Sequence, residues 1–174
     1  MNIFLTGHPG VGKSTIIKKT LAELNIVPSG FYTLAGKKDK NGGSDVYIHE
    51  ASNQDLLEST SNRVGHRVGD GVNYEAFPQT FDTIGVKILQ NATLPLIVMD
   101  ELGFMENNAL LFQKLVLKTL DGNIPVIGVI KPKDTAFLNQ VKQHPKTKLI
   151  EITEANRDEM LLELIDILKE LHIR

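Results

Sequence analysis

Residues 7 to 14 read Gly7-His8-Pro9-Gly10-Val11-Gly12-Lys13-Ser14 and match the pattern G-x-x-x-x-G-K-[ST] without a mismatch. The glycines allow the backbone to curl so that successive N–H groups converge on the oxygen atoms of an anion. A short apolar segment, residues 2–6, precedes this stretch, and a segment with helical spacing, residues 14–24, follows it. This order of strand, glycine-rich loop and helix predicts a phosphate-binding loop at a helix N-terminus.

Two side chains of the loop supply the chemistry that a nucleoside triphosphate requires. Lys13 is expected to reach the β- and γ-phosphates, and the hydroxyl of Ser14 is expected to coordinate Mg²⁺. We therefore predict that residues 7–14 and the adjacent Thr15 bind nucleotide, with Mg²⁺ as the cofactor. A glycine-rich turn that arises by chance is the competing interpretation, and the flanking strand and helix argue against it.

Strand and helix patterns alternate along most of the chain. The predicted strands are residues 2–6, 94–99, 125–130 and 149–152, all short apolar runs. The predicted helices are residues 14–24, 108–120, with Gly122 as a C′ cap, 135–142, and a last one that begins at Asn156. This alternation predicts an α/β, three-layer P-loop fold, with a mostly parallel sheet and helices on both faces.

Residues 26–78 do not follow this alternation. The segment is rich in glycine and holds only two short β-type pieces, residues 31–34 and 46–49. We interpret it as an irregular insert of hairpins and loops that crosses over the functional edge of the sheet.

Length and composition limit the classes of protein that are possible. The 174 residues suffice for one domain spanning residues 1–174. A net charge of -2 disfavours a nucleic-acid binder with a broad basic face, and the absence of cysteine excludes disulfides and thiolate metal sites. No apolar run approaches the ~18 residues of a membrane span. We expect a soluble cytoplasmic protein, and the sequence is compatible with a monomer.

An acidic pair follows the predicted strand 94–99. Asp100 is the expected partner of Ser14 at the metal, and Glu101 is placed to orient or deprotonate an attacking water. Simpler explanations exist for both residues. The acidic pair can merely end the strand, and Glu101 can be a solvated surface carboxylate.

Several basic residues are further candidates. Arg63 or Arg67, both in the 26–78 segment, could neutralise charge at the γ-phosphate, and we select Arg67 as the catalytic candidate. Lys131 follows a predicted strand and is either a γ-phosphate sensor or, the interpretation that we favour, a surface lysine. Asn156 and Arg157 are candidates for contacts near the nucleotide base, although Asn156 and Glu159 also fit a simple capping box.

Beyond the phosphate loop, two strings narrow the assignment: D-E-x-G-x-M-E at residues 100–106 and T-x-x-N-R-D at residues 153–158. With Phe112, they make the whole chain resemble a family of small P-loop nucleoside-triphosphatases found in thermophilic prokaryotes and, as the cancer-related nucleoside-triphosphatase, in vertebrates. The resemblance implies Mg²⁺-dependent hydrolysis of nucleoside triphosphates with little preference among bases.

The resemblance also implies the remaining nucleotide-binding positions, which are Asp100, Glu101, Leu102, Gly103, Phe104 and Met105. The sequence departs from the family pattern after Gly30-Phe31-Tyr32-Thr33, in the stretch 68–72, which lacks a tyrosine, and at Lys131-Pro132-Lys133.

Two other functional classes stay open. A nucleotide or small-molecule kinase would need an acceptor pocket, which residues 26–78 could form, and a lid, but residues 131–148 contain no arginine of the kind that arms such lids. A non-catalytic nucleotide-binding adaptor would not need the carboxylate of Glu101.

Overall fold

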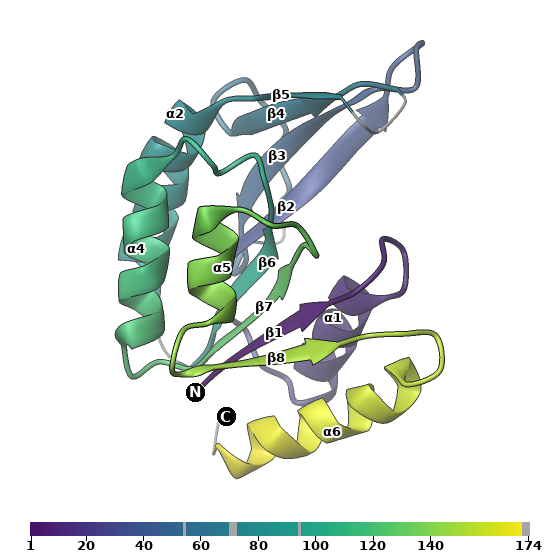
Figure 1. Cartoon of the computed structure of the whole chain (residues 1–174), viewed down its shortest axis with the longest axis vertical. Coiled ribbons are helices and arrows are strands. Elements are labelled where there is room, and N and C mark those ends of the chain that lie inside the picture. Colours follow the sequence, from purple (N-terminus) through teal and green to yellow (C-terminus); the bar gives the residue numbers. More distant parts are fainter. Residues whose placement is uncertain (54, 70–72, 94, 172–174) are drawn as a thin grey trace.

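One mixed β-sheet of eight strands forms the centre of the fold (Figure 1). The computed structural model describes residues 1–53, 55–69, 73–93 and 95–171. The strand order is β5-β4-β3-β2-β6-β7-β1-β8. The strands are β1 (Asn2–Thr6), β2 (Ser29–Lys38), β3 (Ser44–Glu50), β4 (Arg63–Arg67), β5 (Tyr74–Ala76), β6 (Ile97–Leu102), β7 (Val126–Ile130) and β8 (Thr147–Glu151).

The sheet has a parallel half and an antiparallel half. Strands β2, β6, β7, β1 and β8 pair in parallel, as the alternation of strands and helices predicts. Strands β3, β4 and β5 then extend the sheet from β2 through antiparallel pairs. Because β7 lies between β6 and β1, the carboxyl ends of these three strands meet at one edge, where the chain turns into the loops of the candidate site.

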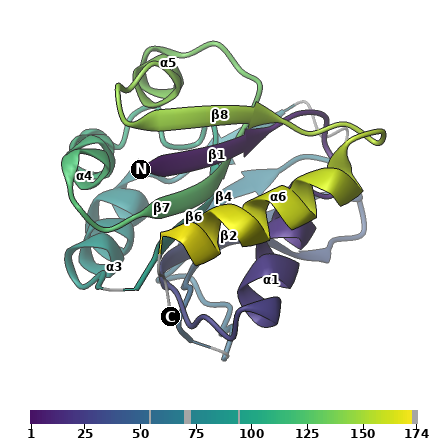
Figure 2. The same ribbon diagram turned by 90° about the horizontal axis from the view of Figure 1, so that it is seen from below.

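Helices cover both faces of the sheet. The helices α1 (Lys13–Glu23) and α6 (Arg157–Glu170) lie on one face, and α3 (Val86–Gln90), α4 (Leu110–Asp121) and α5 (Ala136–Lys142) lie on the other (Figure 2). The short α2 (Pro78–Thr80) and the π-helical turn η1 (Phe81–Gly85) lead into α3. None of the helices in the described residues is long and apolar enough to cross a membrane.

Two apolar clusters fill the spaces between the layers. In β1, Phe4 points into the cluster beneath α3, α4 and α5, whereas Ile3 and Leu5 point into the cluster beneath α1 and α6. Phe112 of α4 is fully buried, and its ring centroid lies 5.4 Å from that of Phe31 and 5.1 Å from that of Phe81. Both faces of the sheet are therefore buried, which explains why its central strands are continuous apolar runs.

The interpretation of residues 26–78 as an irregular insert needs correction. Its strands β2 to β5 belong to the same sheet as β1, and β2 pairs directly with β6 in parallel. The antiparallel strands beyond β2 carry many polar residues and many that are only partly buried, so the sequence lacks the apolar runs that mark the central strands.

Some element boundaries also differ from the predictions. Strand β6 begins at Ile97 and continues to Leu102, so that the acidic pair lies within the strand, because β2 and β7 hold it on both sides. Leu94, predicted to start this strand, lies outside the described residues, as do residues 70–72. The helical stretch from Pro78 to Gln90 was not predicted at all.

Two predicted helix caps take another form. Gly122 follows α4 with φ -67° and ψ -176°, an extended conformation and not the left-handed one of a C′ glycine. Asn156 precedes α6, but its side chain accepts a hydrogen bond from the backbone N–H of Thr153 at 2.8 Å and donates one to the carbonyl oxygen of Glu151 at 2.9 Å. The Asn156 side chain therefore stabilises the β8–α6 loop. It does not form the predicted capping box with Glu159.

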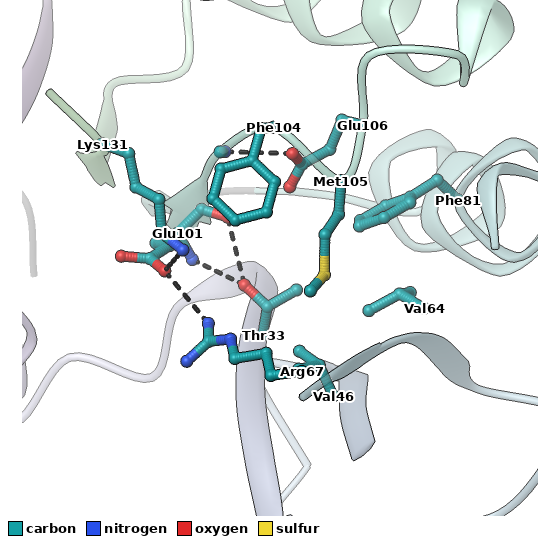
Figure 3. A pocket seen from close by; sticks show the side chains of 11 residues that line it. Thr33, Val46, Val64, Arg67, Phe81, Glu101, Phe104, Met105, Glu106 and Lys131 are labelled. Carbon is teal, nitrogen blue, oxygen red and sulfur yellow. Dashed lines mark hydrogen bonds and ion pairs between the residues drawn. The ribbon is translucent and has the colours of Figure 1, made fainter. Parts of the chain in front are cut away.

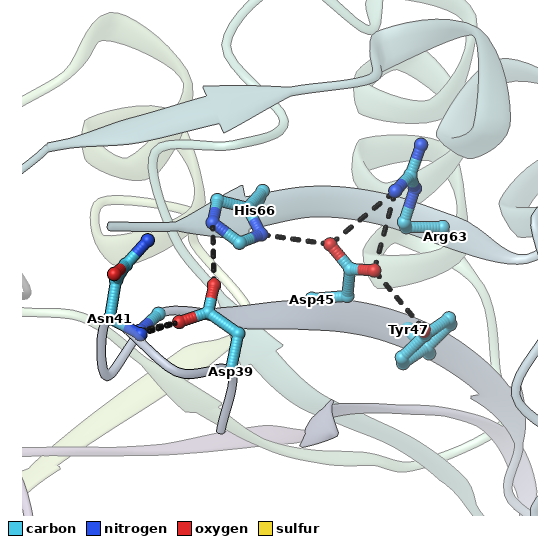
Figure 4. A network of polar contacts seen from close by, with 7 residues as sticks. Asp39, Asn41, Asp45, Tyr47, Arg63 and His66 are labelled. Carbon is cyan, nitrogen blue, oxygen red and sulfur yellow. Dashed lines mark hydrogen bonds and ion pairs between the residues drawn. The ribbon is translucent and has the colours of Figure 1, made fainter. Parts of the chain in front are cut away.

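A polar network ties β3 to β4 (Figure 4). The carboxylate of Asp45 contacts His66 at 2.9 Å and Arg63 at 3.3 Å, and the hydroxyl of Tyr47 donates to it at 3.3 Å. Burial raises the pKa of Asp45, but the hydrogen bonds from His66 and Arg63 outweigh burial and lower that pKa overall. This network fixes β4, and with it the position of Arg67, while it engages Arg63 away from the phosphate loop.

The contact between β2 and β6 yields a prediction about Gly30. Its φ of +94° suits glycine, and a Cβ there would lie 2.1 Å from the carbonyl oxygen of Val98. We expect Gly30→Ala to lower the free energy of unfolding by about 2 kcal/mol or more, measured by urea denaturation. Gly36→Ala on the same strand is the control, because a Cβ there would meet only the side chains of Tyr47 and Glu58. Equal losses in the two variants would contradict this account of Gly30.

Candidate active site

A cleft of about 1010 Å³ lies at the carboxyl ends of the parallel strands. The phosphate loop forms one wall, and the ends of β4 and β6 with the β7–α5 loop form the rest. The side chains and backbone that line it are Gly7, Pro9, Gly10, Gly12, Lys13, Ser14, Thr15, Arg67, Tyr74, Glu101, Phe104, Asn107, Lys131, Pro132, Lys133, Asp134 and Thr135. A cleft at this edge is the usual ligand site of an open α/β sheet.

The backbone of the phosphate loop requires glycine. Gly7 has a φ of +131°, and a Cβ there would lie 2.3 Å from the carbonyl oxygen of Ile152 in the β8–α6 loop. Gly10 and Gly12 have φ of +80° and +107°, and the space around them is open. The open space beside these two glycines lies in front of the N-terminus of α1, where backbone N–H groups attract an anion.

Lys13 is held inside the loop that precedes it. Its side chain is buried, and Nζ donates hydrogen bonds to the carbonyl oxygens of Gly7 at 3.0 Å and His8 at 2.7 Å. Burial lowers the pKa of Lys13, and the charges of Glu101 and Asp100 act in the opposite direction. The ammonium group is thus positioned beside the carboxylates and opens onto the cleft.

Ser14 and Asp100 form the predicted pair of oxygen donors. Ser14 Oγ donates a hydrogen bond of 2.9 Å to Asp100 Oδ1, which links α1 to β6 across β7. Asp100 is only 3% exposed, and its Oδ2 has no hydrogen-bond partner among the described residues. Burial raises the pKa of Asp100 to about 6, although the hydrogen bond from Ser14 opposes this rise. A buried carboxylate oxygen without a partner, next to a hydroxyl, suits a hard divalent cation such as Mg²⁺.

Glu101 lines the cleft. Its carboxylate lies between two cations, Lys131 and Arg67 (Figure 3). Its Oε1 is 3.0 Å from Lys131 Nζ and 3.6 Å from Arg67 Nη2. The backbone N–H of Glu101 donates to Thr33 Oγ1 at 2.8 Å, and the Thr33 hydroxyl donates to the Glu101 carbonyl oxygen at 3.1 Å. These contacts fix the backbone of Glu101, while its carboxylate lines the same cleft as the phosphate loop.

The comparisons with known proteins agree with this geometry. Residues 2–165 match the protein family described as NTPase. The chain belongs to this NTPase family. It is 33% identical to the nucleoside-triphosphatase THEP1 of Thermotoga sp. (strain RQ2), over 97% of this chain and 96% of that protein. It is 30% identical to the human cancer-related nucleoside-triphosphatase, over 94% of both chains.

Solved structures of the family share the fold. The crystal structure of THEP1 from Aquifex aeolicus superposes with a TM-score of 0.71, at 27% identity, over 97% of this chain and 99% of that one. The solution structure of the human cancer-related protein gives a TM-score of 0.68, at 26% identity and 97% coverage of both chains. The family resemblance, the α/β P-loop fold and the nucleoside-triphosphatase class expected from the sequence are thus confirmed.

Several residues of this NTPase that were predicted to bind nucleotide do not line the cleft. Leu102 and Met105 are buried in the core beneath α3 and α4, and Val11 is buried beneath α1. The described lining also omits His8, Asp100, Gly103, Asn156 and Arg157. Asp100 lies beneath Ser14, whereas Arg157 is half-exposed beside Asp158. The proposed base contacts of Asn156 and Arg157 therefore gain no support from the cleft.

Other lining residues were missed or undervalued in the sequence. Lys131, interpreted as a surface lysine, is only 21% exposed and pairs with Glu101. Its position directly after β7, at the edge that also carries Asp100, was the signal that it belongs to the site. Tyr74 enters from β5, and its ring lies 4.2 Å from that of Phe104. No local sequence pattern predicts that Tyr74 lines the cleft, because its position depends on the pairing of β4 with β5.

A second carboxyl group, that of Glu106, is buried behind the site (Figure 3). Its Oε2 accepts a hydrogen bond of 3.0 Å from the backbone N–H of Gly103, which holds the turn that follows β6. Glu106 is 2% exposed, and burial raises its pKa to about 7, although hydrogen bonds to its own backbone and to Gly103 oppose the rise. In this NTPase, therefore, Glu106 is partly protonated near neutral pH.

The raised pKa of Glu106 predicts a pH dependence of stability. Because the folded state binds the proton more tightly, the contribution of Glu106 to stability falls as pH rises from the usual value of 4.5 through about 7, by about 3 kcal/mol. We expect Glu106→Gln to remove this contribution in urea denaturation across that range, since the amide does not titrate, and to leave the separate contribution of Asp100, whose pKa burial raises to about 6. Glu163→Gln, on the surface, should leave the slope unchanged. Identical slopes in wild type and Glu106→Gln would contradict the assignment.

Proposed function

We propose that this protein hydrolyses nucleoside triphosphates to the diphosphate and phosphate in a Mg²⁺-dependent reaction, by in-line attack of water on the γ-phosphorus. The observation that carries this proposal is the position of the Glu101 carboxylate. It lies in the same cleft as the phosphate loop, and Glu101 directly follows Asp100, the buried partner of Ser14. A carboxylate that faces a bound triphosphate can take the proton of a water molecule.

Different residues of the cleft would bind the phosphates, activate the water and neutralise the developing charge. The loop amides and the α1 N-terminus bind the phosphate chain, and Lys13 balances charge on its β- and γ-phosphates. Glu101 orients the water and accepts its proton as the new P–O bond forms and the bond to the β–γ bridging oxygen breaks. Arg67 is the candidate for neutralising charge that develops at the γ-phosphate, since it lines the cleft whereas Arg63 is engaged by Asp45.

Ser14 and Asp100 are the residues that would hold Mg²⁺. The ion would supply positive charge to the phosphate oxygens, which supports the departure of the diphosphate. The partner-free Oδ2 of Asp100, judged over the described residues, supports this assignment. We further propose a cytoplasmic location, where the triphosphate substrates occur, and little selectivity among bases, because the charged groups of the cleft address phosphates.

Of the two alternative classes, the adaptor fits the site less well. A non-catalytic adaptor does not need the carboxylate of Glu101, which is 27% exposed and lines the same cleft as the phosphate loop. A kinase remains compatible with the exposed Tyr74 and with Arg67, which residues 26–78 contribute to the cleft wall. A direct test must therefore separate transfer to water from transfer to an acceptor.

Substitution of Glu101 should separate binding from turnover. We expect Glu101→Gln to keep or tighten nucleotide binding and to reduce the hydrolysis rate by ~100-fold or more, because the amide accepts no proton. Lys13→Ala is the contrasting variant, and we expect it to lose tight triphosphate binding. Calorimetry and a phosphate-release assay measure the two properties. Unchanged turnover in Glu101→Gln would remove Glu101 from the mechanism.

A second experiment distinguishes hydrolase from kinase. We expect phosphate release with ATP and Mg²⁺ alone, and no more than a small increase when nucleosides or nucleotides are added as acceptors. The assay should count free phosphate and phosphorylated acceptor separately. Turnover that depends strictly on an added acceptor would overturn the hydrolase proposal.

A further inference from the structure

The ion pair between Glu101 and Lys131 occupies the carboxylate that the proposed reaction needs. Oε1 of Glu101 accepts from Lys131 Nζ at 3.0 Å, a charge-assisted contact inside a partly buried cleft. A carboxylate oxygen held this closely by an ammonium group is engaged and is not open to a water molecule. For water to bind there, Lys131 must release this oxygen.

The sheet order puts Lys131 within reach of both partners. Lys131 follows β7, which lies between β1, the strand that leads into the phosphate loop, and β6, the strand that carries Glu101. Its backbone N–H donates to the carbonyl oxygen of Leu102 at 2.9 Å, so the root of the side chain is fixed. The flexible stem can therefore swing from Glu101 toward the phosphate loop without a change in the backbone.

We propose that Lys131 exchanges Glu101 for the γ-phosphate when a nucleoside triphosphate binds. One event then delivers a cation to the terminal phosphate and frees Glu101 for the attacking water. The inference rests on the proposed function, and it assigns a catalytic role to Lys131 together with a mechanism by which the site distinguishes triphosphate from diphosphate.

The electrostatics favour this exchange only for a triphosphate. A terminal phosphate carries more negative charge than one carboxylate, so it competes for the ammonium group at comparable distance. A diphosphate lacks the phosphate at this position and leaves the ion pair in place. The ammonium also lies 4.6 Å from the ring centre of Phe104 while it contacts Glu101, a favourable cation–π distance.

Arg67 is a less suitable partner for this exchange. It approaches Glu101 from β4, on the opposite side of β6 from β7, and at the longer distance of 3.6 Å. Lys131 therefore makes the closer of the two contacts with this oxygen.

The experiment compares the affinity for a non-hydrolysable ATP analogue with that for ADP, both with Mg²⁺, by titration calorimetry. We expect Lys131→Met to weaken analogue binding by about 10- to 100-fold and to leave ADP binding within about twofold, since only the analogue offers a γ-phosphate. Lys131→Arg should retain most of the preference. Lys148→Met is the control, because Lys148 makes a similar pair with Glu163 at 3.1 Å outside the cleft.

A double-mutant cycle tests the exchange itself. Glu101→Gln releases Lys131, so it should tighten analogue binding several-fold in the wild-type background and by a smaller factor in the Lys131→Met background. Equal gains in both backgrounds, or a Lys131→Met variant that keeps its preference for the analogue over ADP, would overturn the inference.

The same measurements separate this inference from the proposed function. A wild-type protein that binds neither ligand would overturn both. A protein that binds and hydrolyses ATP, with an unchanged preference for the analogue in Lys131→Met, would overturn the role of Lys131 alone.

Discussion

The hydrogen bond of 2.9 Å between Ser14 and Asp100 is the contact on which the site depends. It joins the first turn of α1 to β6, although β7 lies between β6 and β1 in the sheet. Because parallel strands end at one edge, residues 86 positions apart in the chain meet with little adjustment of the backbone. The phosphate loop, Glu101 and Lys131 then share one cleft, and each is supplied by a different strand end.

The parts of this arrangement that are encoded locally could be predicted from the sequence. The phosphate loop is a backbone structure, and the glycines at positions 7, 10 and 12, all with positive φ, are visible as residue types. Buried parallel strands appear as apolar runs, so β1 and β7 were found with at most one residue of error. The meeting of Ser14 with Asp100 followed from the general rule for strand ends.

The parts that depend on long-range pairing could not be read in the same way. Arg67 reaches the cleft because β4 pairs with β3 and β3 with β2, and the polar, half-exposed strands of residues 26–78 show no clear periodicity. The sequence around a lysine that follows a strand does not show whether the side chain faces solvent or a carboxylate. A role for Lys131 in the site was therefore not the interpretation that we favoured. Asn156 fits a capping pattern, yet its side chain bonds within the preceding loop, where the backbone offered better-placed partners.

Two buried carboxyl groups identify the region of the cleft independently of any comparison with known proteins, because their burial is energetically unfavourable. Asp100 and Glu106 are 3% and 2% exposed, and burial raises the pKa of both, so their charged forms destabilise the fold at neutral pH. Asp100 follows the buried apolar residues Leu96–Met99, where another apolar side chain would pack without this penalty. Residues that weaken the fold in this way are expected where a ligand compensates for them. A cation beside Asp100 would lower its pKa and offset the penalty, which links the stability of β6 to occupation of the cleft.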